Sequence, residues 1–180
     1  MKAYSKLVLL CSLLIAMPVS AETPAEQFER EMKNSREIIS NQRFDLVKQY
    51  MSLTAFEEKQ FLGVYNRYRD AMKPISDAQT KLVTDYVTAY TNNKLTDKLA
   101  DHFTRSMFDL AGKKLTVRKK FVSEFQVFLK PRPVARFMQL ENKLDAIMSY
   151  DLARKIPLVP TDNATAPAHL KIDWSSAANL

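Results

Sequence analysis

Hydrophobic positions between Thr54 and Tyr90 repeat in steps of three and four residues. They fall at Phe61, Tyr65, Tyr68, Met72, Ile75, Leu82 and Tyr86. This spacing is typical of a helix that packs lengthwise against other helices. Pro74 lies inside the run, where proline kinks or breaks a helix, but the repeat keeps its phase across it. The pattern therefore predicts one kinked helix, about 55 Å long at ~1.5 Å per residue, with partners of similar length.

A first helix is predicted to run from Thr23 to about Met51. Residues Thr23 to Glu26 have the pattern of a capping box, with Pro24 at the first helical position. The expected apolar face of this helix comprises Phe28, Met32, Ile38, Ile39, Leu46, Val47 and Tyr50.

Two more helices are predicted after a polar turn at residues 91–94. The third begins after Thr96 and ends before Pro131 and Pro133, and the fourth ends near Lys155, before Pro157. The face expected for the third comprises Phe103, Met107, Leu110, Val117, Phe121, Phe125 and Phe128, with Lys114 filling a gap. The face expected for the fourth comprises Phe137, Leu140, Leu144, Ile147, Met148 and Leu152.

These patterns predict an all-α protein, because strand signals are nearly absent. Short connections favour four helices in elongated antiparallel hairpins, with two long central helices. Residues 160–180 are rich in Ala, Thr, Asn, Pro and Ser, which predicts a disordered tail. Within this tail Leu170, Ile172 and Trp174 alternate and could form a short docking strand. The helical domain is therefore expected over residues 22–159.

Residues 1–21 have the pattern of a secretory signal peptide. Lys2 and Lys6 precede an apolar run of 11 residues, 7–17, and Val-Ser-Ala at 19–21 resembles a cleavage site. The run is too short to span a membrane, so we expect cleavage after Ala21 and no stable membrane span afterwards. The rest of the chain contains no cysteine, and we expect it to reside in the periplasm.

Basic residues are concentrated in the second half of the chain. Residues 22–101 contain 12 basic and 13 acidic side chains, whereas residues 102–180 contain 13 and 7. The excess comes mainly from Lys113, Lys114, Arg118, Lys119, Lys120, Lys130, Arg132 and Arg136. Such a surface attracts anionic partners, so these residues are the candidate partner-binding site. Nucleic acid is not expected as a partner after export, and a merely solubilising face is the alternative.

Motifs for enzyme chemistry are absent from the sequence. There is no glycine-rich phosphate loop, no nucleophile motif and no zinc-protease motif, so we expect a protein that is not an enzyme and has no cofactor. One conceivable metal site combines Asp101, His102, Met107 and Glu141, but these residues form a poor ligand set for zinc or copper. Glu141 and Asp145 are expected on a solvated face or beside the basic third helix.

The two central helices begin with the same Leu-Thr pair. The first copy is Leu53-Thr54-Ala55-Phe56-Glu57 and the second is Leu95-Thr96-Asp97-Lys98-Leu99. With the signal peptide, the helical pattern and the basic balance, these copies resemble the Leu-Thr-x-x-Gln repeat of the Spy/CpxP-like periplasmic family. The likeness extends over residues 53–159 and includes Phe137 to Asp145, which resembles an uncharacterised branch with degenerate motifs. The resemblance implies curved helical hairpins that dimerise into a cradle.

The resemblance implies binding of proteins rather than catalysis. We expect an ATP-independent, chaperone-like protein or envelope-stress adaptor whose apolar and basic surface binds unfolded or acidic envelope proteins. One alternative is an accessory subunit dedicated to a single membrane protein or sensor. A second alternative is a metal-responsive sensor. The chaperone or adaptor hypothesis predicts exposed apolar surface beside the basic residues. The accessory-subunit hypothesis predicts one tight partner, and the metal-sensor hypothesis predicts a response to chelators.

Overall fold

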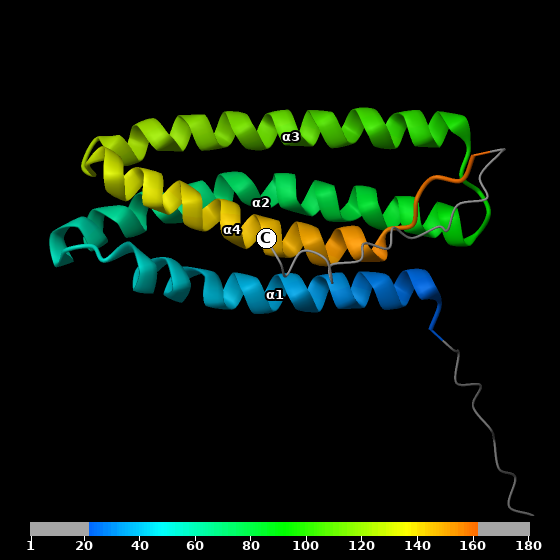
Figure 1. The fold of residues 1–180 in the computed structure, drawn as a ribbon, viewed down its shortest axis with the longest axis horizontal. Coiled ribbons are helices and arrows are strands. Elements are labelled where there is room, and N and C mark those ends of the chain that lie inside the picture. Colours follow the sequence, from blue (N-terminus) through cyan, green and yellow to red (C-terminus); the bar gives the residue numbers. More distant parts are fainter. Residues whose placement is uncertain (1–21, 162–180) are drawn as a thin grey trace, which may run out of the picture.

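The computed structural model describes residues 22–161, which form four helices and no strand (Figure 1). The helices are α1 (Pro24–Met51), α2 (Ala55–Thr91), α3 (Asp97–Gln126) and α4 (Pro131–Lys155). The prediction of an all-α protein is therefore confirmed. The signal peptide predicted over residues 1–21 and the tail segment from Leu170 to Trp174 lie outside the described residues.

The helices form an antiparallel bundle in which the backbone of each helix lies close to those of two others. α2 packs against α1 and α3, and α4 packs against the same two helices from the other side. In Figure 1, α3 and α1 form the upper and lower edges. α4 begins beside the end of α3 and crosses toward α1, so the first half of α3 is covered mainly by α2.

α2 is a single helix of 37 residues that continues through Pro74, as the hydrophobic repeat predicted. Pro74 is exposed, so its ring disturbs the solvent-facing side of the helix rather than the packed side. The side chain of Thr54 caps the helix and forms a capping box with Glu57. Val83, rather than Leu82, is the buried residue in the later part of the repeat.

Four predicted core residues are instead exposed to solvent. Ile38 and Tyr50 lie outside the buried face of α1, because that face passes through Arg43. Met107 lies on the part of α3 that α4 does not cover, and Ile147 lies at the open edge between α1 and α4. The sequence prediction was wrong at these positions because it followed apolar residues and left polar ones out of the face.

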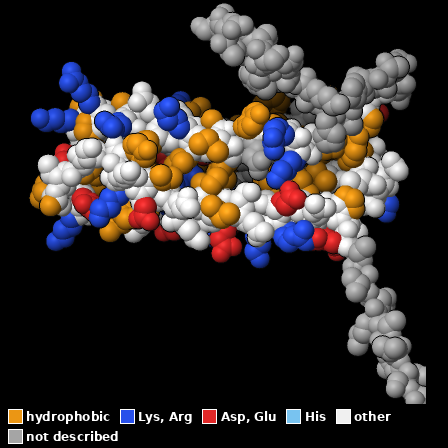
Figure 2. Space-filling model, turned by 60° about the horizontal axis from the view of Figure 1, so that its bottom comes forward, with side chains coloured by type: hydrophobic (Ala, Val, Ile, Leu, Met, Phe, Trp, Pro, Cys, Tyr) orange, Lys and Arg blue, Asp and Glu red, His pale blue; other side chains and the backbone are white. Residues whose placement is uncertain are grey.

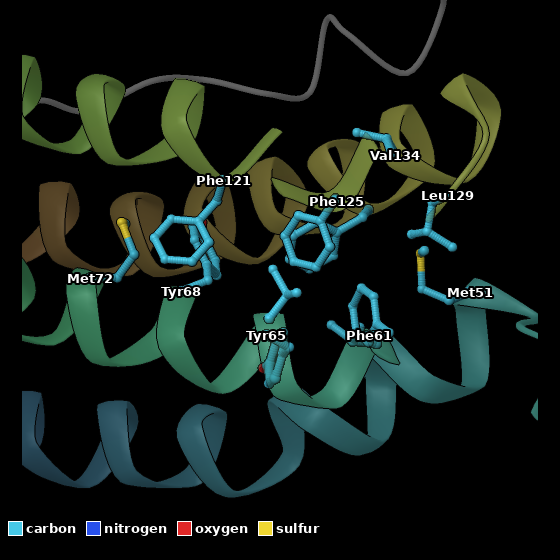
Figure 3. Packing of buried hydrophobic residues seen from close by; sticks show 12 residues of the cluster. Met51, Phe61, Tyr65, Tyr68, Met72, Phe121, Phe125, Leu129 and Val134 are labelled. Carbon is cyan, nitrogen blue, oxygen red and sulfur yellow. The ribbon is translucent and has the colours of Figure 1, made fainter. Parts of the chain in front are cut away.

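The larger hydrophobic cluster lies at the end of the bundle where α4 begins (Figure 3). It comprises Val47, Met51, Phe61, Val64, Tyr65, Tyr68, Met72, Phe121, Phe125, Leu129, Val134 and Phe137. Phe137 is completely buried, and its ring contacts the rings of Phe61, Tyr65, Tyr68 and Phe125. This aromatic packing joins α2, α3 and α4.

A smaller cluster closes the opposite end of the bundle. Its buried members are Phe28, Met32, Val83, Tyr86 and Val87. The Tyr86 hydroxyl donates a hydrogen bond of 2.9 Å to the carbonyl of Pro157, which ties the segment after α4 to α2. None of the helices formed by residues 22–161 is sufficiently long and apolar to cross a membrane.

Candidate functional site

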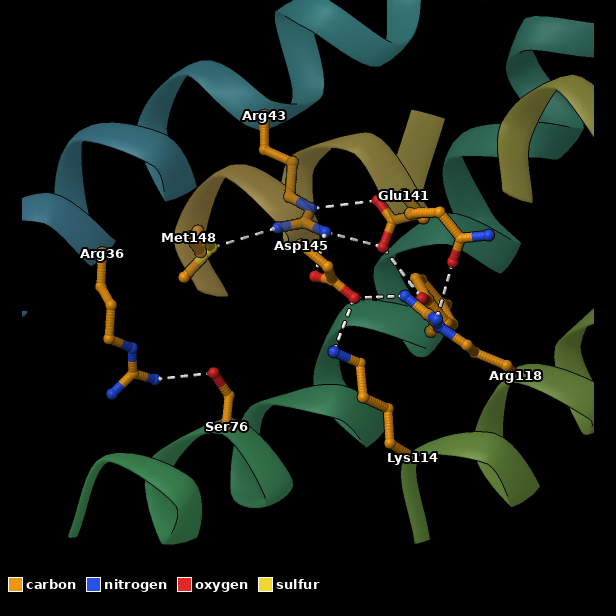
Figure 4. Close-up of polar contacts among 10 residues, drawn as sticks. Arg36, Arg43, Ser76, Lys114, Arg118, Glu141, Asp145 and Met148 are labelled. Atoms are coloured by element: carbon orange, nitrogen blue, oxygen red, sulfur yellow. Dashed lines mark hydrogen bonds and ion pairs between the residues drawn. The ribbon is translucent and has the colours of Figure 1, made fainter. Parts of the chain in front are cut away.

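A buried ion pair between α1 and α4 lies between the two hydrophobic clusters (Figure 4). Arg43 donates two hydrogen bonds to the Glu141 carboxylate, at 3.0 Å from Nε to Oε1 and 2.9 Å from Nη2 to Oε2. The two side chains are only 5% and 1% exposed. The Tyr68 hydroxyl donates a third hydrogen bond to Glu141, at 2.9 Å. Donors from α1 and α2 therefore satisfy one buried carboxylate of α4.

Asp145, one turn after Glu141, connects this pair to α3. Its carboxylate is 3.3 Å from Nη2 of Arg43 and 2.6 Å from Nζ of Lys114, and it also pairs with Arg118. We call these five residues the ionic cluster. It contains three cations, Arg43, Lys114 and Arg118, and two carboxylates, Glu141 and Asp145, so it carries one net positive charge when all are ionised.

The surroundings favour the charged forms of Asp145 and Arg43. Burial disfavours the charged carboxylate of Asp145, but the hydrogen bond from Lys114 and the nearby arginines outweigh it, so the pKa of Asp145 is lowered. Burial also disfavours the charged form of Arg43, yet Glu141 and Asp145 raise its pKa. Burial first, and then Glu141, raise the pKa of Tyr68, which keeps its hydroxyl protonated as a donor.

A cleft of about 730 Å³ opens beside the ionic cluster, between α1, α2 and α4. Its lining includes Arg43, Lys114 and Asp145, and it extends toward the smaller hydrophobic cluster at Met32 and Leu152. Figure 4 shows the Arg36–Ser76 contact, which joins α1 to α2, set apart from the Lys114–Asp145 contact. Small-molecule sites in proteins occupy volumes of this order.

The eight residues of the predicted basic site differ in exposure: two are partly buried and six are exposed. Lys114 and Arg118 belong to the ionic cluster and are only partly exposed, at 28% and 21%. The polar position of Lys114 in the hydrophobic repeat of α3 was the signal for this. The solvated face predicted for Glu141 was wrong, because Glu141 is buried, whereas Asp145 does lie beside the basic third helix. The remaining basic residues are exposed: Lys113, Lys119, Lys120, Lys130, Arg132 and Arg136.

The Leu-Thr pairs have a clear local role in the structure. Thr54 and Thr96 are the N-caps of α2 and α3, and each accepts a hydrogen bond from a backbone N–H three residues later. Leu53 packs against the larger hydrophobic cluster and Leu95 against the smaller one. The repeated pair therefore fixes the start of each central helix at opposite ends of the bundle.

The imagined metal ligands do not form a site. Glu141 is fully engaged with Arg43 and Tyr68, and Asp101 pairs with Arg105 on the exposed side of α3. Within residues 22–161, no group of three or more His, Cys, Asp or Glu side chains is placed to hold a metal ion.

The bundle and its ionic cluster define an all-α helical protein with a polar layer inside its core. Comparisons of the chain with protein-family models, with curated proteins and with solved structures find no match. The function is therefore argued from the surface and the interior of the bundle.

Proposed function

We propose that this protein is a periplasmic, ATP-independent chaperone-like protein or stress adaptor that binds other proteins and is not an enzyme. The main observation in support of this proposal is an apolar stripe on α3. Phe108 and Leu115 lie two turns apart on one helical face, and they are 73% and 52% exposed. Lys119, one turn after Leu115, continues this face. Unfolding proteins expose apolar segments, and an exposed apolar stripe can bind such segments.

Exposed basic side chains occur on the same helix and at the start of the next one. Lys113 and Lys120 are exposed on α3, and Arg132 and Arg136 are exposed at the beginning of α4. On the face shown in Figure 2, hydrophobic side chains also lie among lysines and arginines. Positive charge near an apolar surface increases the rate of encounter with acidic proteins. The resemblance to Spy/CpxP-like proteins supports the same proposal.

Aggregation assays test this proposal directly. We would follow light scattering by several unrelated unfolding proteins, without ATP, at low and high salt. We expect broad suppression that weakens with salt and that is reduced in the Phe108→Ser/Leu115→Ser double variant. Phe56→Ser is the matched control, because Phe56 is also 73% exposed but lies in the first turn of α2.

A second set of variants tests the basic residues. Lys113, Lys119 and Lys120 are changed to Ser, while Lys114 and Arg118 are left in place because they belong to the ionic cluster. Reduced suppression at low salt would support capture by charge. If the wild-type protein suppresses none of the aggregating proteins, the proposal is wrong, and a subunit dedicated to one membrane protein or sensor becomes the better hypothesis. Crosslinking would then identify the partner.

A further inference from the structure

The ionic cluster at the edge of the cleft contains more cations than carboxylates, whereas exposed carboxylates such as Glu37 and Asp70 lie elsewhere in the cleft lining. The ionic cluster has three cations for two carboxylates, and Asp145 is shared by all three cations. Nε of Arg118 is buried and has no hydrogen-bond acceptor among the described residues. An uncompensated charge away from water is costly. Lys114 is a cation of the cluster that lines the cleft, whereas Arg118 does not line it, so an anion bound in the cleft beside Lys114 would offset the excess charge.

Arg69 supplies a second, independent sign of an anion site. It lines the cleft from α2 and is half-buried, yet it makes no ion pair or hydrogen bond with any other residue between 22 and 161. Its neighbour Tyr68 donates to Glu141, which places Arg69 at the level of the ionic cluster. The other half-buried arginine of the cleft wall, Arg36, differs because Ser76, Asp77 and Thr80 engage it.

The cleft also has an apolar part that leads away from these cations. Met148 and Leu152 follow Asp145 on the same side of α4, and Met32 and Ile39 line the cleft from α1. Asp145 and Leu152 are seven residues apart, which corresponds to about 10 Å along a helix. The length from the charged end to the apolar end thus suits the extended chain of a medium-length fatty acid.

We propose that this cleft binds a single-chain amphipathic carboxylate. The carboxylate head lies against Arg69 and Lys114, and the aliphatic chain lies along Met148 and Leu152. One negative head group would balance the one excess positive charge of the ionic cluster. This small-molecule site is separate from the apolar stripe on α3 and does not rest on the proposed binding of proteins.

Titration calorimetry with sodium decanoate below its micellar concentration tests the proposal, using protein expressed from the full coding sequence. We expect one decanoate per chain, a higher unfolding temperature when it is bound, and no comparable effect of decyltrimethylammonium, which has the same chain but the opposite charge. Inorganic phosphate supplies an anion without a chain and should bind more weakly than decanoate. Equal binding of the cationic amphiphile, or no binding of decanoate, would overturn the proposal.

Two arginine variants locate the site. Arg69→Gln removes the half-buried cation of the cleft wall that pairs with no residue between 22 and 161, and we expect it to weaken decanoate binding about tenfold, as for loss of a charge-assisted hydrogen bond. Arg67→Gln is the control: Arg67 is on the same helix but is 60% exposed and pairs with Glu124 outside the cleft. Because Arg69 has no ion pair or hydrogen bond among the described residues, its variant should fold normally. Wild-type affinity in Arg69→Gln would show that the head group does not bind there.

Discussion

The Arg43–Glu141 ion pair predicts strong thermodynamic coupling between α1 and α4. Glu141→Leu would leave the Arg43 guanidinium buried with only Asp145, at 3.3 Å, as an anionic partner that it already shares with two cations. Arg43→Met would leave the Glu141 carboxylate with the Tyr68 hydroxyl as its remaining hydrogen-bond donor. Each single change therefore leaves a buried charge that the protein no longer neutralises.

The cost of each single change follows from this burial. Removing one member of a buried ion pair typically destabilises a protein by about 3–5 kcal/mol. The unfolding entropy of about 140 ordered residues makes each kcal/mol equivalent to roughly 3 °C, so we expect each single variant to unfold about 10–15 °C lower. The double variant Arg43→Met/Glu141→Leu removes both charges and should recover most of this loss, because apolar side chains of similar size replace the pair.

Urea unfolding followed by circular dichroism at the helix band measures all four proteins of this double-mutant cycle. The expected result is a coupling free energy of about 3 kcal/mol or more between the two positions. The surface pair Lys81–Asp85 gives a control cycle, in which we expect a much smaller coupling because both side chains are more than half exposed. Additive losses in the Arg43–Glu141 cycle would refute the reasoning.

Three further predictions concern packing, capping and pH. Phe137→Ala should destabilise the protein by about 3–5 kcal/mol because it leaves a cavity among four aromatic rings, whereas Val127→Ala, at a position 85% exposed, should have little effect on the urea midpoint. Thr54→Ala should cost about 1 kcal/mol in the same assay because it removes the N-cap of α2. Hydrogen bonds from the backbone and side chain of Thr54 lower the pKa of Glu57, and the pKa of Asp145 is lowered despite its burial. Their stabilising contributions are present above the unfolded-state values of 4.5 and 3.8 and are lost as pH falls through the lower folded values. Urea midpoints should therefore fall in acid, with a shallower fall in Glu57→Gln, and a midpoint that rises in acid would contradict this.

The helices were predictable from sequence because their signals are local. The Thr54 cap, the three–four repeat of α2 and the prolines after α3 define element boundaries without reference to the rest of the chain. A single helix through Pro74 was predicted correctly, because the hydrophobic residues before and after Pro74 follow the same repeat. The aromatic core around Phe137 followed from the same repeats.

The ionic cluster was not predictable to the same degree, because its partners come together only in the folded bundle. Arg43 and Glu141 are 98 residues apart in the chain. A signal did exist in α1, where Arg43 is four residues after Ile39 and four before Val47, on the face that is buried. Lys114 interrupted the repeat of α3 in the same way. Polar residues at positions where the repeat predicts a buried residue are candidates for an internal network of ion pairs and hydrogen bonds.

The ionic cluster also bears on how α1 and α4 are aligned along the bundle axis. Apolar side chains at three–four spacing fit a neighbouring helix nearly as well after a slide of one turn. A slide of one turn of α1 would bring Ile39 or Val47, instead of Arg43, opposite the buried Glu141 carboxylate. Because that arrangement leaves a charge without a partner, we expect the cluster to exclude misaligned bundles and to select a single register, even though apolar replacements would pack as tightly.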